Sequence, residues 1–199
     1  ISVISEIDLA YRYMGKKTKI MSITGTNEKT TTATKIYELL KEAGFDVELA
    51  GNAGFSFAKL VSDGKEPDYV VLELSSYQLE NDPEVHSYIA GIINLTPDHL
   101  TRYNSLDDYY KTKFNIFDHQ NENDYALINL DDKEILRIIS ENKDIDDKIK
   151  AKRIFLSGEK KADVFQKDGM INVTDHNSQL IPLMKTSELS LKGKHNLEN

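Results

Sequence analysis

Two stretches of the sequence are apolar at successive positions and end in polar residues. They read "DYVVLELS" (Asp68–Ser75) and "YIAGIINLT" (Tyr88–Thr96). Continuous apolar runs of this length are typical of strands that are buried on both faces, as in a parallel sheet covered by helices. They fall well short of a membrane span. The sequence therefore predicts a covered sheet rather than a one-sided one.

A helical pattern separates the first strands of this sheet. From Thr30 to Ala43 the apolar residues recur at helical spacing, and Gly44 lies where a helix C-cap glycine belongs. Further strands are expected at residues 17–24, 45–51, 124–132 and 152–158, and further helices at residues 106–117 and 132–141. This alternation predicts an α/β fold with a mostly parallel sheet of the phosphate-loop type, flanked by helices.

The pattern changes after Gly158. Residues 162–184 alternate between apolar and polar side chains, and the Asp168-Gly169 pair is a hairpin turn pattern. A small antiparallel β subsheet is expected near the C-terminus. The charge-rich residues 141–152 are expected to form a solvated helix end and a loop.

Composition narrows the function. A length of 199 residues suits one large domain, or one with a small appendage. The absence of cysteine excludes disulfides, thiolate zinc sites and a cysteine nucleophile. A net charge of −8 argues against a nucleic-acid surface, but a local pocket for an anion remains open. The first residues lack a signal-peptide pattern, so a cytoplasmic location is expected. The missing initiator methionine suggests a piece of a longer protein.

The stretch "ITGTNEKTTT" (Ile23–Thr32) suggests a loop that binds phosphate. In the general pattern G-x-x-x-x-G-K-[ST], Ile23 and Glu28 replace the glycines, whereas Lys29 and Thr30 match. A strand before the loop and a helix after it would turn backbone N–H groups and the positive end of the helix dipole toward an anion. The alternative is an ordinary helix N-cap made by a threonine.

The residues also carry a resemblance to a known family. "GTNEKTTT" resembles the Gly-Thr-Asn-Gly-Lys-Thr-Thr loop of the Mur ligases and the folylpolyglutamate synthases. Four further stretches resemble family elements in the same order: "GNAG" (Gly51–Gly54), "LELSSYQLE" (Leu72–Glu80), "NLTPDHLTRY" (Asn94–Tyr103) and "GKHNLEN" (Gly193–Asn199). The Ser-Ser-Tyr-Gln form points to the members that add D-glutamate in peptidoglycan synthesis.

The resemblance implies that residues 1–199 are the central ATP-binding domain of a three-domain ligase. ATP and two Mg²⁺ ions are the implied cofactors. The implied partners are small molecules, a uridine-nucleotide-linked acceptor and D-glutamate, and no nucleic acid or membrane. A monomer is expected. Two alternatives stay open: a non-catalytic nucleotide-binding module whose loop Glu28 disables, and a folylpolyglutamate synthase-like ligase. A kinase or GTPase is disfavoured because both glycines of the general pattern are missing.

The resemblance also assigns residues to roles. It places Gly25, Thr26, Asn27, Lys29, Thr30, Thr31, Asn196 and Asn199 at the nucleotide. It places Asn52, Ser75, Gln78 and His195 at the substrate. Metal ligands would be Thr30, Glu73, His99 and Lys113, and catalytic groups would be Lys29, His99 and Lys113.

For several of these residues, a purely structural role is the alternative. Ser75 and Gln78 also suit turns and helix caps. Glu73, at the carboxyl end of a buried strand, suits Mg²⁺ but also a salt bridge. A lysine on an amphipathic helix, such as Lys113, is usually a surface group. The resemblance places Lys113 at a lysine that is carbamylated in the family, with Lys111 as second choice.

Glu28 departs from the family pattern, which has glycine there. A carboxylate about 4 Å from a phosphate charge would cost roughly 4 kcal/mol at an effective dielectric constant of 20. ATP binding therefore requires that Glu28 point outward and that its backbone avoid a conformation open only to glycine.

Overall fold

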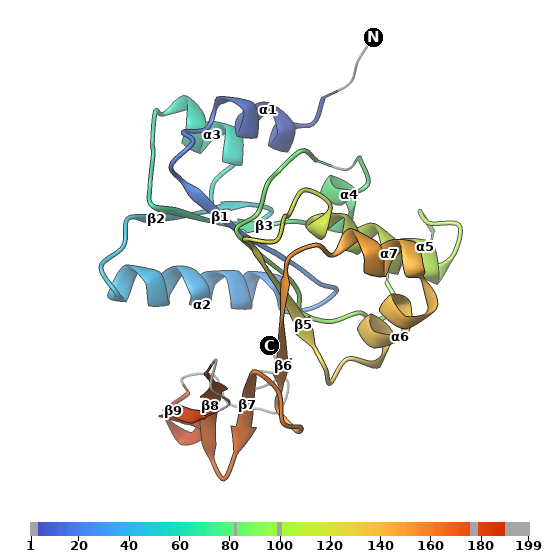
Figure 1. The fold of residues 1–199 in the computed structure, drawn as a ribbon. Helices are drawn as coiled ribbons and strands as arrows, with labels where there is room; N and C mark the ends of the chain where they lie inside the picture. Colours follow the sequence, from blue (N-terminus) through green and yellow to red (C-terminus); the bar gives the residue numbers. More distant parts are fainter. Residues whose placement is uncertain (1–3, 82, 99–100, 176–178, 190–199) are drawn as a thin grey trace.

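The computed structural model describes residues 4–81, 83–98, 101–175 and 179–189. Within them, nine strands form one sheet in the order β2-β3-β1-β4-β5-β6-β7-β8-β9 (Figure 1). Neighbouring strands run parallel from β2 to β7, and β8 and β9 are added antiparallel. The predicted α/β class, with a small antiparallel part near the C-terminus, is confirmed.

The helices and strands lie close to the predicted ranges. The strands are β1 (Lys19–Thr24), β2 (Val47–Gly51), β3 (Tyr69–Glu73), β4 (Ile89–Ile92), β5 (Tyr125–Asn129), β6 (Lys152–Ser157), β7 (Val164–Lys167), β8 (Met170–Thr174) and β9 (Leu180–Lys185). The helices are α1 (Glu6–Tyr13), α2 (Lys29–Glu42), α3 (Phe57–Ser62), α4 (Ser76–Leu79), α5 (Leu106–Lys113), α6 (Lys133–Glu141) and α7 (Lys143–Lys148), with 3₁₀ turns η1 (Phe114–Phe117) and η2 (Thr186–Glu188).

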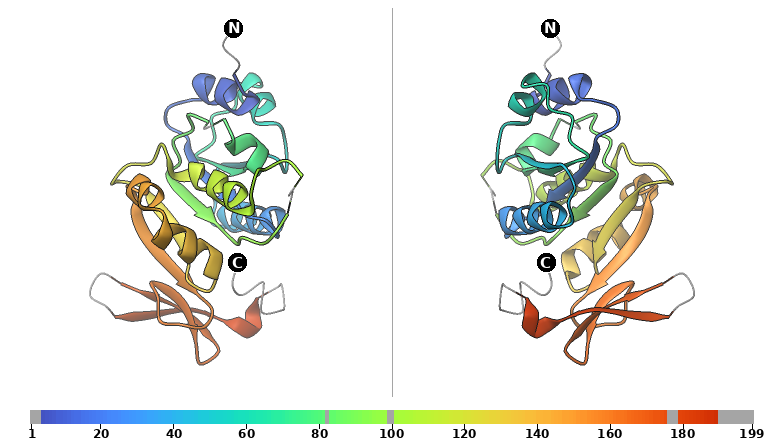
Figure 2. Two further views of the ribbon diagram at one scale, coloured as in Figure 1. Left: turned by 90° about the vertical axis from the view of Figure 1, so that its right-hand side faces the viewer. Right: turned by 90° about the vertical axis from the view of Figure 1, so that its left-hand side faces the viewer.

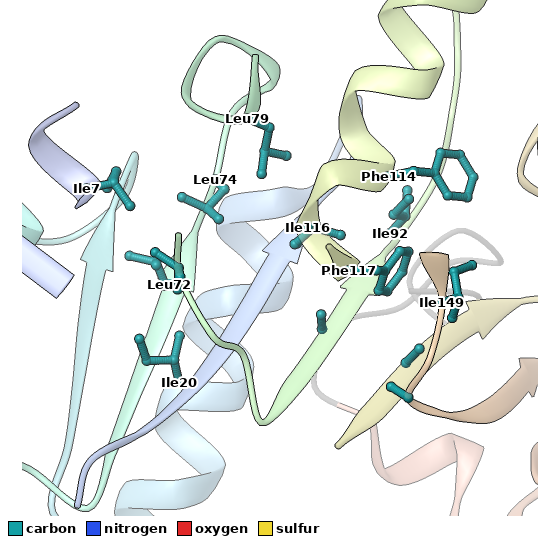
Figure 3. Close-up of a cluster of buried hydrophobic side chains, with 14 of the residues drawn as sticks. Ile7, Ile20, Leu72, Leu74, Leu79, Ile92, Phe114, Ile116, Phe117 and Ile149 are labelled. Carbon is teal, nitrogen blue, oxygen red and sulfur yellow. The ribbon is translucent and has the colours of Figure 1, made fainter. Parts of the chain in front are cut away.

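Helices cover both faces of the parallel strands. On one face, Ala33 of α2 packs with Val47 of β2 and Val71 of β3. On the other face, a larger cluster joins Leu72 to side chains from α1, α3, α5, η1 and α6. Figure 3 shows part of this cluster, including Phe117. Successive side chains of a strand point to opposite faces, so burial of both faces explains the continuous apolar runs.

Two turn predictions are confirmed in detail. Gly44 has a φ of 87°, and its N–H donates to the carbonyl of Lys41, while the N–H of Phe45 donates to Leu40. This pair of bonds is a Schellman motif, which satisfies carbonyls at the end of α2. Asp168 and Gly169 both have positive φ, 52° and 74°, as the two central residues of a type I′ hairpin turn do. They join β7 to β8.

One prediction is wrong. Residues 141–152 were expected to hold only a helix end and a loop, but α7 begins at Lys143. Ile145 and Ile149, four residues apart, are both buried in the main core cluster. Ile145 lies within α7 and Ile149 is its C-cap residue, so these two isoleucines hold the helix and its end against the core despite the many charges.

Three further short helices were not predicted. Of these, α1 and α3 pack on each other near the start of the described chain, as two rotated views show (Figure 2). The carboxylate of Glu6 accepts hydrogen bonds from the hydroxyl of Ser56 and the N–H of Ala58. Elsewhere in the fold, α4 is a single turn. No helix in the described part of the chain has the length and apolar character needed to cross a membrane.

Candidate functional site

The loop from Gly25 to Glu28 leaves the carboxyl end of β1, in the middle of the parallel sheet. The chain leaves β1 toward β2 on one side, whereas β4 lies on the other side. Such a change of direction opens a crevice at the carboxyl ends of the strands, where open α/β sheets bind ligands. The loop is also close to β4, because a Cβ on Gly25 would lie 3.3 Å from the Cβ of Ile93.

The start of α2 has the features of an anion site. Glu28 is its N-cap residue, and no side chain of the described residues caps the helix there. The first turn contains no acidic residue. Uncapped N–H groups at a helix start, together with the helix dipole, favour an anion. The alternative of an ordinary threonine N-cap is therefore wrong.

Glu28 adopts a left-handed backbone conformation, with φ 60° and ψ 13°. For a residue with a side chain this conformation costs roughly 1–2 kcal/mol, whereas glycine adopts it freely. The carboxylate of Glu28 accepts a hydrogen bond of 2.8 Å from the hydroxyl of Thr31. The loop thus holds a conformation that favours glycine, although it is not restricted to glycine. This local contact helps to hold the side chain.

Asn94 and Thr96, which follow β4, brace the loop from the side. Asn94 Oδ1 accepts from the N–H groups of Thr26 and Asn27, at 3.2 and 2.8 Å, and Asn94 Nδ2 donates to the carbonyl of Asn27. Thr96 Oγ1 accepts from Asn27 Nδ2. These two bracing residues were missed at the sequence level, although Asn94 opens the stretch "NLTPDHLTRY".

Glu73 lies beneath the loop with no exposed surface. The hydroxyl of Thr30 donates to its Oε2 at 2.8 Å, and Asn52 Nδ2 donates to its Oε1 at 2.9 Å. Each carboxylate oxygen therefore has a donor from a residue that was expected in the site. Lys29 turns back into the loop, where its Nζ donates to the carbonyl of Thr26 at 2.9 Å.

Lys113 is buried, with 1% of its surface exposed, in contrast to the usual surface lysine. Its Nζ donates to the carbonyl of Gly25 at 2.8 Å and lies 4.7 Å from the centroid of the Tyr109 ring. Burial, and after it the charge of Lys29, lower the pKa of Lys113 to about 7, against a smaller opposing effect of Asp98. The amine is thus partly uncharged at neutral pH, directly below the loop.

Ser75 and Gln78 form the capping box of α4. Ser75 Oγ accepts from the N–H of Gln78, and Gln78 Oε1 accepts from the N–H of Ser75. The helix-capping role, which the sequence suggested as the alternative for these two residues, is therefore present, and Ser75 lies two residues after Glu73. His99, His195, Asn196 and Asn199 lie outside the described residues.

The donor set suits a magnesium ion that is shared with a phosphate. In the part of the chain that the structure describes, no three His, Asp or Glu side chains gather closely enough to hold a metal alone. Mg²⁺ commonly takes one or two carboxylates and completes its shell with water and phosphate oxygens. The carboxylate of Glu73 and the hydroxyl of Thr30, in contact beside the loop, fit that requirement.

Known proteins resemble this chain along its whole length. Residues 23–199 match the family described as Mur ligase middle domain. The chain is 45% identical, over its full length, to UDP-N-acetylmuramoylalanine--D-glutamate ligase of Fusobacterium nucleatum, and it spans 44% of that relative. A MurF ligase from Thermotoga maritima in complex with ADP superposes with a TM-score of 0.66 at 20% identity, over 97% of this chain and 46% of that one.

A more distant likeness is a bifunctional folylpolyglutamate synthase/dihydrofolate synthase with Mn, AMPPNP and L-glutamate bound. Its TM-score is 0.59 at 14% identity, over 97% of this chain and 60% of that one. At such identities, these two solved structures show the fold alone.

Replacing Asn94 with alanine should loosen the loop. Asn94→Ala removes the side-chain acceptor of Thr26 and Asn27, and each hydrogen bond is worth about 0.5–1.5 kcal/mol. We expect amide hydrogen exchange of Asn27, measured by NMR, to become roughly tenfold faster. The Thr26 amide should change less because it also bonds to the backbone carbonyl of Asn94. Asn123→Ala, at an exposed asparagine, is the control. Unchanged exchange at Asn27 in Asn94→Ala would show that the Asn94 side chain does not hold the loop.

Removing Lys113 should change how stability depends on pH. The Lys113 pKa of about 7 lies below its ordinary value of 10.5, so between these pH values the unfolded chain binds more protons than the folded one. Stability from this group therefore rises with pH across that window. In urea unfolding from pH 7 to 9.5, in buffers free of carbon dioxide, Lys113→Met should lose this rise. Lys111→Met is the control for the removal of one lysine from the same helix. If the free energy of unfolding depends on pH in the same way in the wild type and in Lys113→Met, the effect of burial on the Lys113 pKa is disproved.

Proposed function

The chain belongs to the Mur ligase family, and from this premise we propose that residues 1–199 are the central, ATP-binding domain of a ligase that adds D-glutamate to UDP-N-acetylmuramoyl-L-alanine. The observation that carries the proposal is the 45% identity, along the entire chain, to a D-glutamate ligase. Because the chain spans 44% of that relative, the acceptor and amino-acid sites would be completed by flanking domains.

The nucleotide would lie with its phosphates against the start of α2. The uncapped helix terminus and the loop from Gly25 to Thr31 support this placement. Lys29 would exchange its bond with the Thr26 carbonyl for a phosphate oxygen and neutralise charge on the transferring group. The Thermotoga maritima ligase of the same fold was solved in complex with ADP, which supports nucleotide binding by this fold. Asn196 and Asn199 would contact the adenine side.

Magnesium would be held by Thr30 and Glu73. The ion would supply charge neutralisation at the phosphates, and Asn52 would keep the Glu73 carboxylate oriented toward it. A second ion would be held by His99 and by Lys113 after carbamylation. The lowered Lys113 pKa supports this step, because only the uncharged amine can attack carbon dioxide. The new N–C bond gives a carbamate, and one proton is released.

The reaction would have two steps. The terminal carboxylate of the acceptor takes the γ-phosphoryl group of ATP, which gives an acyl phosphate and ADP. The amine of D-glutamate then attacks the acyl carbon, phosphate leaves, and the nitrogen loses a proton to give the amide. On the substrate side, Asn52, Ser75, Gln78 and His195 would orient the acceptor. The work of the protein is therefore positioning and charge neutralisation.

Glu28 supports one competing function. A carboxylate at the helix start opposes phosphate, and its left-handed backbone adds strain. The competing function is a non-catalytic module with a disabled loop. A folylpolyglutamate-type ligase is less favoured, because the likeness to that enzyme is at 14% identity.

The location, oligomeric state and partners of the protein are part of the same proposal. We propose a cytoplasmic, monomeric protein that acts on small molecules and binds neither nucleic acid nor membrane. The net charge of −8 supports the exclusion of nucleic acid, since phosphate backbones need clustered cations.

Calorimetric titration with ATP and Mg²⁺ tests the loop. We expect the chain to bind ATP and Lys29→Ala to bind at least tenfold more weakly, because a hydrogen bond to a charged group is worth about 1.5–3 kcal/mol. Lys35→Ala, on the exposed side of the same helix, is the matched control. Glu28→Gly should bind at least as tightly as the wild type. Binding that appears only in Glu28→Gly would favour the disabled module, and no binding in either would contradict the nucleotide site.

ADP release tests the reaction in the full-length protein. With UDP-N-acetylmuramoyl-L-alanine present, ADP formation should depend on D-glutamate and should fall at least 100-fold in Lys29→Ala, on the order of 3 kcal/mol of lost transition-state stabilisation. ADP release with a folate acceptor alone would point to the related ligase class. ATP binding without ADP release for either acceptor would point to the non-catalytic module.

A further inference from the structure

A cavity of about 470 Å³ lies where α1 ends and β1 begins. Its volume falls within the range of roughly 300–1,000 Å³ that small-molecule sites occupy. The end of α1, the residues from Met14 to Thr18, the first two residues of β1 and the segment before β4 form its wall. It lies apart from the residues of the proposed nucleotide site.

The cavity wall is strongly positive for so acidic a chain. Four of its residues are cations, namely Arg12, Lys16, Lys17 and Lys19, whereas Glu84 is the single carboxylate among the wall residues that the structure describes. The chain as a whole has a net charge of −8, so this cluster of cations has the opposite sign to the net charge of the chain. Charges of one sign around a hollow focus the field and attract a ligand of opposite charge.

The cations differ in how they are engaged. Arg12 forms a salt bridge of 3.4 Å with Glu84, and both side chains are more than half exposed. Lys19 lies over the ring of Tyr88, with its Nζ 4.1 Å from the ring centroid. Lys16 and Lys17 are exposed and form no ion pair or side-chain hydrogen bond with the residues that the structure describes. Two positive charges thus remain available at the cavity.

Other nearby charges do not cancel this field. His86, also on the wall, is hydrogen-bonded to the carboxylate of Asp124 at 2.7 Å, so that carboxylate already has a partner. Glu66, whose side chain lies against Gly15, and Asp8, which accepts a hydrogen bond from the N–H of Glu84, are further acids near the wall. On the described wall itself, the four cations outnumber the carboxylate of Glu84, so the wall has a net positive charge.

The rest of the wall suits a ligand with an apolar part. Tyr11, Met14, Ile20 and Tyr88 contribute rings and apolar side chains beside the cations. A mixture of a few charged groups with aromatic and aliphatic walls is typical of sites for small organic ligands. A hollow of this size suits such a molecule better than a nucleic acid, which needs an extended basic surface.

The cavity and the phosphate loop lie at opposite ends of β1. Lys19 is the first residue of this strand, and the loop follows its last residue, Thr24 (Figure 1). At about 3.3 Å per residue, the two sites are separated by roughly 20 Å. One ligand of ordinary size therefore cannot fill both.

We propose that this cavity binds a small phosphorylated organic anion, at a second site distinct from the phosphate loop. Lys16 and Lys17 bind the phosphate group, and Tyr11 and Tyr88 contact the organic part. Arg12 and Glu84, joined by their salt bridge, form another part of the wall.

An NMR titration of the chain with phenyl phosphate tests this site. In the Lys29→Ala background, which weakens the loop, the probe should shift the amide signals of residues 15–19 and 88. Inorganic phosphate should bind more weakly than phenyl phosphate, because it lacks the ring. Lys16→Glu/Lys17→Glu should weaken binding at least tenfold, and Lys16→Gln/Lys17→Gln should weaken it less.

The matched control is Lys161→Glu/Lys167→Glu, which makes the same charge change at exposed lysines before and on β7. This control should leave the affinity unchanged. Equal weakening by both charge-reversing pairs, or shifts confined to residues 25–31, would overturn the proposal. Tighter binding of a short single-stranded RNA through residues 15–19 would also overturn it, in favour of a nucleic-acid surface. An unchanged amide spectrum before titration verifies that each variant is folded.

Discussion

The double pairing of β1 is the constraint on which the site depends. The strand is hydrogen-bonded to β3 on one edge and to β4 on the other, with a continuous parallel register on both. Parallel pairing brings the carboxyl ends of the three strands to one edge of the sheet. The loop after β1, Glu73 at the end of β3 and Asn94 just after β4 therefore meet, although they are distant in sequence. Helix packing on both faces then leaves that edge as the place where polar groups gather.

Two buried ionisable groups lie under the loop, and the fold accommodates them in different ways. Glu73 keeps a donor on each carboxylate oxygen, from Thr30 and Asn52. Lys113 has a backbone carbonyl as its hydrogen-bond acceptor, and burial lowers its pKa to about 7. Burying a charge is costly, and a group can respond by gaining partners or by losing its charge. The loop is thus supported by one group that is held by hydrogen bonds and one that titrates near neutral pH.

Sequence patterns predicted most of the fold because the local preferences of the residues favour the same helices, strands and turns as the packing of the core does. The apolar runs, the helix that ends at Gly44 and the Asp168-Gly169 turn each follow from short-range preferences. The helix α7 was missed because Ile145 and the C-cap residue Ile149 are outnumbered by charges, and only tertiary packing shows that both are buried. Burial of Lys113 runs against its residue type, which predicts a surface position, although its spacing from Tyr109 and Tyr110 places it on the buried face of α5. The brace from Asn94 depends on strand order, which no local pattern contains.

The brace has a consequence for how the chain acquires its shape during synthesis. Asn94 lies 68 residues after Thr26, so the loop leaves the ribosome long before its partner has been made. At about 5–20 residues per second, that interval is on the order of 3 to 14 seconds. The β7–β8 hairpin is different, because its strands are joined by a two-residue turn and such hairpins close in about 1–10 µs. The β7–β8 hairpin can thus form almost as soon as it emerges, whereas the loop is without its brace for those seconds.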